Sequence, residues 1–335
     1  MTASDLAKWR DWYRGRTAVI TGGYGYIGDG LSAALRNAGC RLRRTTRGRQ
    51  GIAGDPEAWP GDLTDPVFCA KLVEGADTVF HLSGQTSVPA AEQDPLGDLK
   101  ANVQSTLTLL AACQKAGRRP AFVYAGTVCV IGLTLSVPVP EDTVERPITV
   151  HDAHKFAAEH EIRVYTEMRA VHGVTLRLAN VYGPGPAASA ADRGVLNKMI
   201  GFALAGQRLT YYDDGAMIRD YVYIDDVIAA FQMAAPAAAS ATRPSYAVGC
   251  GAGHRISEAF SLIADIVSSL GRPRADVVSV PWPPSHHLID RRSFVADTAP
   301  FTAFCGWRPS TPLPDGIRRT AETLLQRDRT TERAR

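Results

Sequence analysis

The residues that most directly indicate chemistry are the glycines of TAVITGGYGYIG, residues 17–28. Gly23, Gly25 and Gly28 have the G-x-G-x-x-G spacing. Counted from Gly22, the same run also satisfies T-G-x-x-G-x-x-G. An apolar run precedes these glycines and a helical pattern follows them. Glycine permits the tight turn and lets a diphosphate contact the backbone, while free N–H groups at the helix start hold its charge. The segment predicts a strand–turn–helix unit that binds a dinucleotide.

The type of dinucleotide is suggested by the next predicted strand, residues 40–46. An acidic residue at the end of this strand typically binds the adenosine ribose 2′-OH. Here the strand ends in Thr45 and Thr46, followed by Arg47 and Arg49. No carboxylate repels a 2′-phosphate and arginine binds one, so the pattern favours NADP over NAD. The alternative is a solvated basic loop, with NAD held by other contacts.

The scaffold for these groups is indicated by alternating patterns further along the chain. Residues 76–83 and 121–125 are strand-like, and residues 99–117 between them are helical. Strands that alternate with helices at this spacing predict a parallel, doubly wound α/β sheet of the Rossmann type.

Composition restricts the class of protein. The 335 residues are 45% hydrophobic and 21% charged, as in ordinary globular proteins, and the net charge of +3 gives no support to nucleic-acid binding. No apolar run reaches about 18 residues, and no apolar signal core stands at the start. The six cysteines lack C-x-x-C and metal-ligand spacings, so we interpret them as core residues in a reducing compartment. We expect a cytoplasmic enzyme without a nucleic-acid, membrane or metal partner.

Several longer stretches together carry a family resemblance. They are TGGYGYIG at 21–28, GDLTD at 61–65, VFHLSGQTSV at 79–88, DPLGDLKANVQSTLTLLAA at 94–112, FVYAGTVCVIG at 122–132, LRLANVYGPG at 176–185, RDYVYIDDV at 219–227, YAVGCG at 246–251 and DRRSFVADT at 290–298. With them the chain resembles the extended short-chain dehydrogenase/reductases, the NAD(P)-dependent sugar-nucleotide epimerases, dehydratases and reductases. The resemblance covers about residues 17–325.

The resemblance implies a catalytic set of Ser/Thr, Tyr and Lys, with the last two in a Tyr-x-x-x-Lys motif on one helix face. Thr127 falls on the first position and Lys155 on the last, but His151 stands where the family has tyrosine. One reading is that His151 is the acid/base, since histidine side chains ordinarily titrate near neutral pH. Other readings are an unidentified acid/base, or a fold that binds nucleotide without redox chemistry. We expect the neighbouring His154 to be a surface histidine.

The reaction type is narrowed by the two residues that follow Thr127. Family 4,6-dehydratases have Asp-Glu in these places and uronate decarboxylases also have Glu, whereas this chain has Val128 and Cys129. Neither supplies a carboxylate, so dehydration and decarboxylation are disfavoured. Epimerisation through a transient ketone remains, with NADPH-dependent reduction of a keto-sugar as the alternative.

The resemblance also implies binding residues. Around the cofactor they are Gly22, Gly25, Tyr26, Ile27, Gly28, Thr46, Arg47, Asp62, Leu63, Leu82, Ser83, Gly84 and Lys155. Around the nucleotide-activated sugar they are Thr86, Asn180, Arg219, Arg291 and Arg292. Arginine suits a diphosphate because its fork donates two parallel hydrogen bonds. The alternative for each arginine is a surface ion pair.

The same resemblance implies a division into domains and a homodimer. The expected parts are an N-terminal extension at 1–16, an NAD(P)-binding Rossmann domain at 17–182 with a return segment at about 219–248, a smaller substrate-binding domain at 183–218 and 249–327, and a tail at 328–335. The expected dimer forms through helices at about 99–116 and 152–170. A competing class is a nucleotide-binding protein without hydride transfer, against which the retained Thr127 and Lys155 argue.

Overall fold

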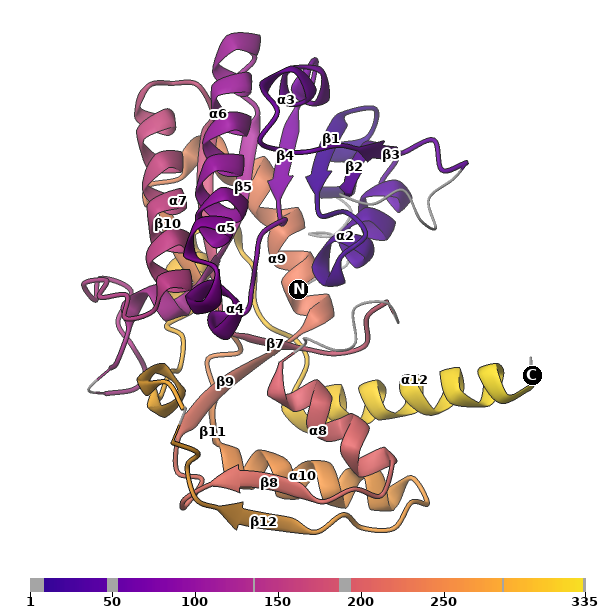
Figure 1. The fold of residues 1–335 in the computed structure, drawn as a ribbon. Coiled ribbons are helices and arrows are strands. Elements are labelled where there is room, and N and C mark those ends of the chain that lie inside the picture. The colour runs from indigo at the N-terminus through magenta and orange to yellow at the C-terminus, as the bar shows by residue number, and fades with distance from the viewer. Residues whose placement is uncertain (1–8, 47–53, 135, 187–193, 285, 334–335) are drawn as a thin grey trace.

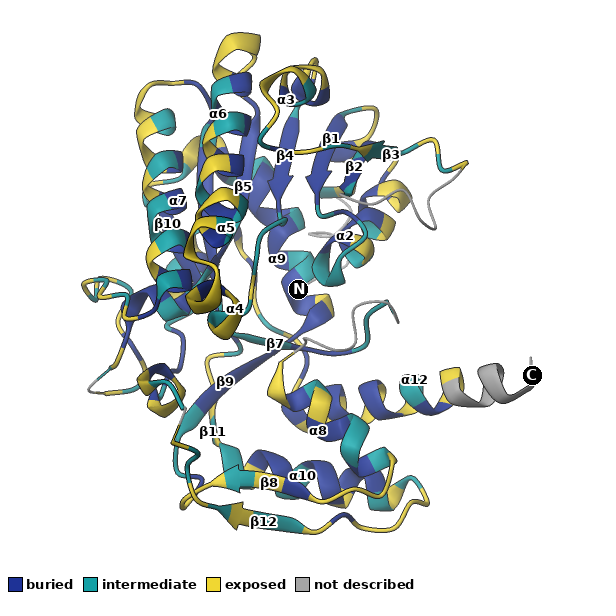
Figure 2. Cartoon of the chain, in the orientation of Figure 1, coloured by how far each residue is buried: buried dark blue, intermediate teal, exposed yellow. Residues whose placement is uncertain are grey.

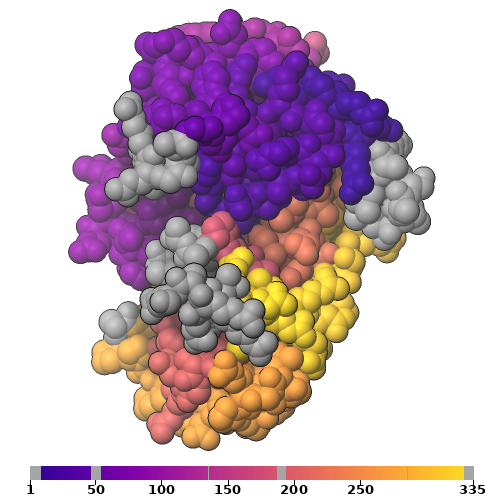
Figure 3. Space-filling model, turned by 90° about the vertical axis from the view of Figure 1, so that its right-hand side faces the viewer, coloured from indigo at the N-terminus to yellow at the C-terminus, as the bar shows by residue number. Residues whose placement is uncertain are grey.

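The computed structural model describes residues 9–46, 54–134, 136–186, 194–284 and 286–333. Figure 1 shows two bodies, with a sheet and its helices above and a smaller group of strands and helices below. In the space-filling view of Figure 3 the N-terminal half forms the upper part of the face, and the C-terminal half forms the lower part.

The upper body contains seven parallel strands in the order β10-β6-β5-β4-β1-β2-β3. They are β1 (Thr17–Thr21), β2 (Arg41–Thr46), β3 (Ala58–Pro60), β4 (Thr78–His81), β5 (Ala121–Thr127), β6 (His172–Leu178) and β10 (Ser245–Val248). The order reverses between β1 and β4, which is the topological switch point of a doubly wound sheet. The predicted Rossmann-type fold is therefore confirmed.

Helices cover both faces of this sheet. They are α2 (Tyr26–Asn37), α3 (Pro66–Val73), α4 (Val88–Gln93), α5 (Pro95–Leu99), α6 (Ser105–Ala116), α7 (Val150–Glu167) and α9 (Ile224–Ala237). Short segments are the π-helical turn η1 (Lys100–Gln104) and the 3-10 turns η2 (Val128–Ile131), η4 (Ala238–Ser240) and η5 (Leu288–Arg291). One apolar core packs Leu72, Leu109 and Ile162 against one face of the sheet. Another packs Leu35 and Phe231 against the opposite face. Figure 2 shows the strands buried between these layers.

The lower body is built from the later part of the chain. Its strands are β7 (Asn180–Tyr182), β8 (Leu209–Tyr212), β9 (Ile218–Tyr223), β11 (Gly253–Arg255) and β12 (Val277–Val280). Its helices are α8 (Val195–Leu204), α10 (Ile256–Ser269) and α12 (Leu313–Arg333), while α11 (Ala299–Cys305) packs on the upper body near α9 and β10. A separate core joins Leu196, Phe260 and Ile317. The lower body thus has its own hydrophobic interior.

Three local expectations need correction. The helix expected over 99–117 is interrupted, because its first turn is π-helical before α6 begins at Ser105. Helix α12 continues to Arg333, through most of the segment expected to be a tail. Cys129 and Cys250 are only half-buried, whereas the other four cysteines are core residues as expected. Among the described helices, none has the length and apolarity needed to cross a membrane.

Candidate active site

The candidate site lies at the carboxyl ends of the parallel strands, where the two bodies meet (Figure 1). Strand β1 leads there into the glycine-rich turn, and β5 ends there at Thr127. Helix α7, which carries His151 and Lys155, packs against β5 and β6. Ligands of open α/β sheets bind at this edge because the helix amino termini and strand ends converge on it.

The glycine-rich turn has the geometry expected of a diphosphate cradle. Gly22 has a φ of +66°, which L side chains rarely adopt. A Cβ added to Gly28 would lie 2.2 Å from the Gly22 carbonyl oxygen, so only glycine fits there. The N-cap of α2, Gly25, offers no side-chain cap to the first amides of this helix. These amides are therefore positioned to donate to a phosphate, and the turn fits a dinucleotide cofactor.

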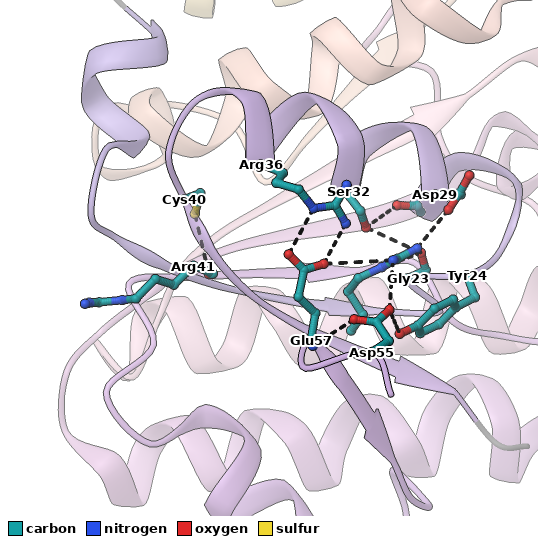
Figure 4. A network of polar contacts seen from close by, with 11 residues as sticks. Gly23, Tyr24, Asp29, Ser32, Arg36, Cys40, Arg41, Asp55 and Glu57 are labelled. Atoms are coloured by element: carbon teal, nitrogen blue, oxygen red, sulfur yellow. Dashed lines mark hydrogen bonds and ion pairs between the residues drawn. The ribbon is translucent and has the colours of Figure 1, made fainter. Parts of the chain in front are cut away.

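Arg44, which the sequence analysis did not single out, supports the glycine-rich turn. Its partners Gly23, Tyr24, Asp29 and Asp55 are labelled in the polar network of Figure 4. Its guanidinium donates to the Gly23 carbonyl and, at 2.8 Å, to Asp29 Oδ1. It also lies 3.5 Å from Asp55 Oδ2 and stacks over the ring of Tyr24. Tyr24 in turn donates to Asp55 at 2.7 Å. Arg44 is thus a satisfied, buried support of the turn.

The predicted contacts to the adenosine ribose are described only in part. Thr46 is the last residue of β2, at the sheet edge where the adenosine half of a dinucleotide is expected. Arg47 and Arg49, which carried the preference for NADP, lie outside the described residues.

A chain of hydrogen bonds links the end of β1 to η1. The backbone amides of Leu82 and Ser83 donate to Thr21 Oγ1, so the Thr21 hydroxyl donates its proton to His81 Nδ1, 2.7 Å away. The other nitrogen, His81 Nε2, then donates to Thr106 Oγ1 at 2.9 Å. This assigns a neutral ring. Burial, with repulsion from Lys155, lowers the pKa of His81 to about 3, in agreement with that assignment.

The Thr106 hydroxyl at the end of this chain donates to the Asn102 carbonyl. The chain therefore ties η1 to the carboxyl edge of the sheet. Other residues implied around the cofactor also lie along this edge. They are Leu82, Ser83 and Gly84 directly after β4, and Asp62 and Leu63 directly after β3. Tyr26 and Ile27 are the first residues of α2.

Thr127 ends β5, and Lys155 contacts the same end of that strand. Thr127 Oγ1 accepts the amide of Cys129 at 3.1 Å, which leaves the hydroxyl proton free to donate elsewhere. Lys155 Nζ donates to the Ala125 carbonyl at 2.7 Å and lies over the Tyr124 ring. Burial lowers the pKa of Lys155 to about 7, against the opposing attraction of nearby carboxylates. The lysine is therefore poised between its charged and neutral forms near physiological pH.

His151 lies in the first turn of α7, four residues before Lys155, and both side chains are buried. Thr149 caps this helix by accepting the amide of Asp152. His151 Nδ1 lies 3.2 Å from Asp152 Oδ1, while its Nε2 is buried without a hydrogen-bond partner. Buried polar atoms are ordinarily hydrogen-bonded, so Nε2 has an unused capacity to donate or accept a hydrogen bond. Spacing on the helix thus predicted correctly that His151 and Lys155 share the buried face.

Two of the arginines that the resemblance implies around the substrate, Arg219 and Arg292, are buried. Arg219 on β9 donates to the Asp290 carbonyl at 2.6 Å and to the Arg292 carbonyl. Burial, and repulsion from Arg292, lower the pKa of Arg219 to about 10. Arg292 is 6% exposed, and its Nε and Nη1 atoms have no partner. Two adjacent buried cations, of which Arg219 donates to carbonyl groups and Arg292 has two unpartnered nitrogens, make a site that attracts an anion.

The structure distinguishes Arg292 from its neighbour Arg291, although the resemblance implied both as binding residues. Arg291 is exposed, stacks near Trp282 and donates to His286 Nε2. Thr86 is exposed on the loop after β4, and Asn180 on β7 donates to the Asp220 carbonyl. Of these three arginines, Arg219 and Arg292 are therefore the buried cations, and Arg291 is exposed.

The expectation that His154 is a surface histidine is wrong. Its Nδ1 lies 2.7 Å from the buried carboxylate of Asp98, which also accepts from Asn102. Asp98 and Asn102 both lie within a stretch that supported the family resemblance, but no local pattern links them to His154. Only the packing of α5 against α7 brings them together.

Comparison with known proteins agrees with this geometry. The profile of the NAD dependent epimerase/dehydratase family matches residues 18–249. The chain is 30% identical to UDP-glucose 4-epimerase of Mycolicibacterium smegmatis over 78% of its own length and 80% of that protein. It is also 30% identical to UDP-glucuronate 4-epimerase 5 of Arabidopsis thaliana, of which it spans about half, 52%. The chain belongs to the NAD-dependent epimerase/dehydratase family.

Solved structures support the same assignment. UDP-glucose 4-epimerase of Thermotoga maritima with UDP-glucose has a TM-score of 0.81 at 25% identity, covering 93% of this chain and 99% of that one. The NAD complex of UDP-glucose 4-epimerase from Thermus thermophilus has a TM-score of 0.79 at 28% identity, covering 92% and 99%. The likeness therefore extends over both bodies of the fold.

Proposed function

We propose that the protein is an NAD(P)-dependent 4-epimerase of a UDP-activated sugar. The observations that carry the proposal are a dinucleotide cradle and a buried His151 with an unpaired Nε2 at the carboxyl edge of the parallel sheet, together with two buried arginines on and near β9 of the lower body. The epimerase relatives act on UDP-glucose and UDP-glucuronate, according to their names, and this supports the substrate class.

The proposed mechanism assigns a proton position to each catalytic residue. A bound nicotinamide supplies reversible hydride transfer. His151 Nε2 accepts the proton of the reacting sugar hydroxyl as the carbon-bound hydrogen leaves as hydride, and the product at that stage is a ketone. When the ketone is reduced again on its opposite face, His151 would return the proton to the sugar oxygen. Thr127 donates its free hydroxyl proton to the same sugar oxygen, and Lys155 binds the ribose.

The substrate diphosphate is held on the other side of the site. Arg219 and Arg292 are buried cations, and the unpaired Nε and Nη1 of Arg292 have the donors that a diphosphate needs. The anion compensates two charges that are otherwise costly to bury. Nucleotide binding would therefore compensate the buried positive charge of the lower body. We propose its segments 183–218 and 249–327 as the substrate domain.

The decisive experiment replaces His151 with Phe. Turnover of UDP-glucose or UDP-glucuronate should fall to background while cofactor binding stays intact. His151→Tyr, which restores the residue seen in the family motif, should retain activity. His160→Phe, an exposed position on the same helix, is the matched control and should behave like the parent protein. Unchanged turnover in His151→Phe would remove His151 from the mechanism.

The principal alternative is an NADPH-dependent keto-sugar reductase, favoured by the absence of a carboxylate at Thr46. The bound cofactor is released from the purified protein and identified, and sugar nucleotides are then added. Altered sugar stereochemistry without a net redox change supports the epimerase. NADPH consumed in proportion to a keto-sugar supports the reductase. Cofactor binding without hydride movement on any sugar supports a non-redox nucleotide-binding protein.

We also propose a homodimer in the cytoplasm. The neighbouring helices α5, α6 and α7 carry exposed apolar side chains. They are Leu96, Leu99, Leu107, Val164 and, at the end of α7, Met168. Exposed apolar residues on adjacent helices support an interface there. The six free cysteines suit a reducing compartment. Light scattering after gel filtration tests the dimer, and a monomer at micromolar concentration would contradict it.

A further inference from the structure

A buried carboxylate lies beside α7, the helix that carries His151 and Lys155. Asp98 of α5 has a fully buried side chain. Its Oδ2 lies 2.7 Å from His154 Nδ1, and its Oδ1 accepts the Asn102 amide at 3.1 Å. A buried carboxylate costs several kcal/mol in desolvation, so a chain keeps one where its charge or hydrogen bonds have a purpose. We therefore expect a role of Asp98 in which its charge or its hydrogen bonds are used.

Asn102 connects this carboxylate to the space around Lys155. Its amide nitrogen also donates to the Gln85 carbonyl, and its Oδ1 is buried without a partner. A methyl group built on Gly84 would lie 2.4 Å from Asn102 Oδ1 and 4.0 Å from Lys155 Nζ. The Asn102 amide, Gly84 and the Lys155 ammonium thus border one small region at the end of β4.

Charged and uncharged groups on the neighbouring helices and strands surround Lys155. Asp98 on α5 and Glu159 on α7 favour its protonated form, whereas burial opposes it. The Tyr124 ring lies beneath Nζ on β5, and the neutral His81 approaches from β4. His151 lies one turn earlier on the same helix. Among the carboxylates that act on Lys155, Asp98 contributes the larger attraction and is the one hydrogen-bonded to a histidine.

We propose that Asp98 and His154 are positioning residues for the reaction. His154 fixes the Asp98 carboxylate, which in turn orients the Asn102 amide and places a negative charge beside Lys155. Neither residue exchanges the substrate proton. The consequence for turnover rests on the proposed function, but the state of Lys155 is measurable without any substrate.

The first test follows the titration of Lys155 by NMR in protein labelled at lysine, of which the chain has six. Lys155→Arg assigns the resonance. Asp98→Asn keeps the shape and removes the charge, so the Lys155 midpoint should fall by at least about one pH unit. Glu167→Gln removes an exposed carboxylate from the same helix and should not move it. An unmoved midpoint in Asp98→Asn would overturn the proposal.

The second test separates the hydrogen bond of His154 from its ring chemistry. In His154→Asn the side-chain amide sits near the position of Nδ1 and still donates to Asp98, whereas His154→Leu removes the donor. We expect His154→Leu to weaken NAD⁺ binding, measured by calorimetry, and to lower kcat, each about tenfold, as for a lost hydrogen bond to a charged group. His154→Asn should stay within about twofold of the parent.

A double variant tests whether His154 acts through Asp98. Because His154 acts through Asp98, adding His154→Leu to Asp98→Asn should produce no further loss. If His154→Asn is as damaging as His154→Leu, the positioning role is wrong and the imidazole itself is needed. Two results together would separate this proposal from the proposed function. If Asp98→Asn shifts the Lys155 midpoint but the parent protein epimerises no sugar, the positioning role of Asp98 and His154 is supported and the proposed function is overturned.

Discussion

The two sides of the candidate site differ in how their buried cations are compensated. On the cofactor side, Arg44 is matched by Asp29, Asp55 and the Gly23 carbonyl. On the substrate side, Arg292 keeps two nitrogens without a partner. Arg44 therefore stabilises the glycine-rich turn with its charge already compensated. Arg292 is buried with an uncompensated charge, which destabilises the fold, and under the proposed function the substrate diphosphate compensates that charge on binding.

The largest effect is expected at the glycine-rich turn. In Gly28→Ala the new methyl group meets the Gly22 carbonyl oxygen, a backbone atom that moves only with the whole turn. NAD⁺ affinity measured by calorimetry should fall by at least about 100-fold, because a displaced turn loses hydrogen bonds to the charged diphosphate that are each worth about 1.5–3 kcal/mol. Gly201→Ala on α8 is the control, because nothing lies within 4 Å of its added methyl group. Normal NAD⁺ affinity in Gly28→Ala would contradict the assignment of this turn as the diphosphate-binding site.

The next largest effect separates affinity from stability at Arg292. Arg292→Met should lower UDP affinity by about 100-fold, equivalent to about 2.7 kcal/mol, because a buried phosphate loses its cation. The same change should raise the free energy of unfolding without ligand by about 1 kcal/mol or more, because an uncompensated buried charge is gone. UDP titration and urea unfolding provide both numbers. A less stable variant would show that Arg292 is compensated within the fold.

The matching change on the cofactor side should have the opposite sign. Arg44→Met removes the donors to the Gly23 carbonyl and to Asp29, and should lower the free energy of unfolding by about 2–3 kcal/mol. Arg36→Met is the control, since its pair with Glu57 is half-exposed and such pairs contribute less than about 1 kcal/mol. If urea denaturation shows that Arg44→Met and Arg36→Met lose equal free energy of unfolding, burial of Arg44 does not explain its contribution to stability.

The smallest effect is a difference in pH dependence at His81. Its folded pKa is lowered to about 3, so between pH 3 and its unfolded value of about 6.5 the unfolded chain binds more protons. Stability from this residue is therefore complete above about pH 6.5 and is lost as the pH falls, by up to about 1.4 kcal/mol per pH unit. Urea unfolding at pH 5.0 to 6.5 should be steeper in pH for the parent than for His81→Gln. Parallel slopes would contradict a buried neutral His81.

Local sequence patterns predicted the parts of the site that depend on neighbours in the chain. The spacing from Gly22 to Gly28 predicted the turn, and the interval from His151 to Lys155 predicted a shared helix face. Burial of Arg44 and exposure of Arg291 were not predictable in this way. Each arginine stands in a run of basic residues, and the run alone does not tell which member points inward.

Contacts between distant segments required the folded chain. His154 and Asp98 are 56 residues apart, and Arg219 contacts Arg292 across 73 residues. Their pairing depends on how α5 packs against α7 and how η5 approaches β9. The sequence by itself determined the doubly wound sheet, the dinucleotide turn and the family, because backbone sterics and periodic burial act over a few residues. Only the tertiary structure decided which charges are compensated, because desolvation and Coulomb attraction depend on neighbours in space.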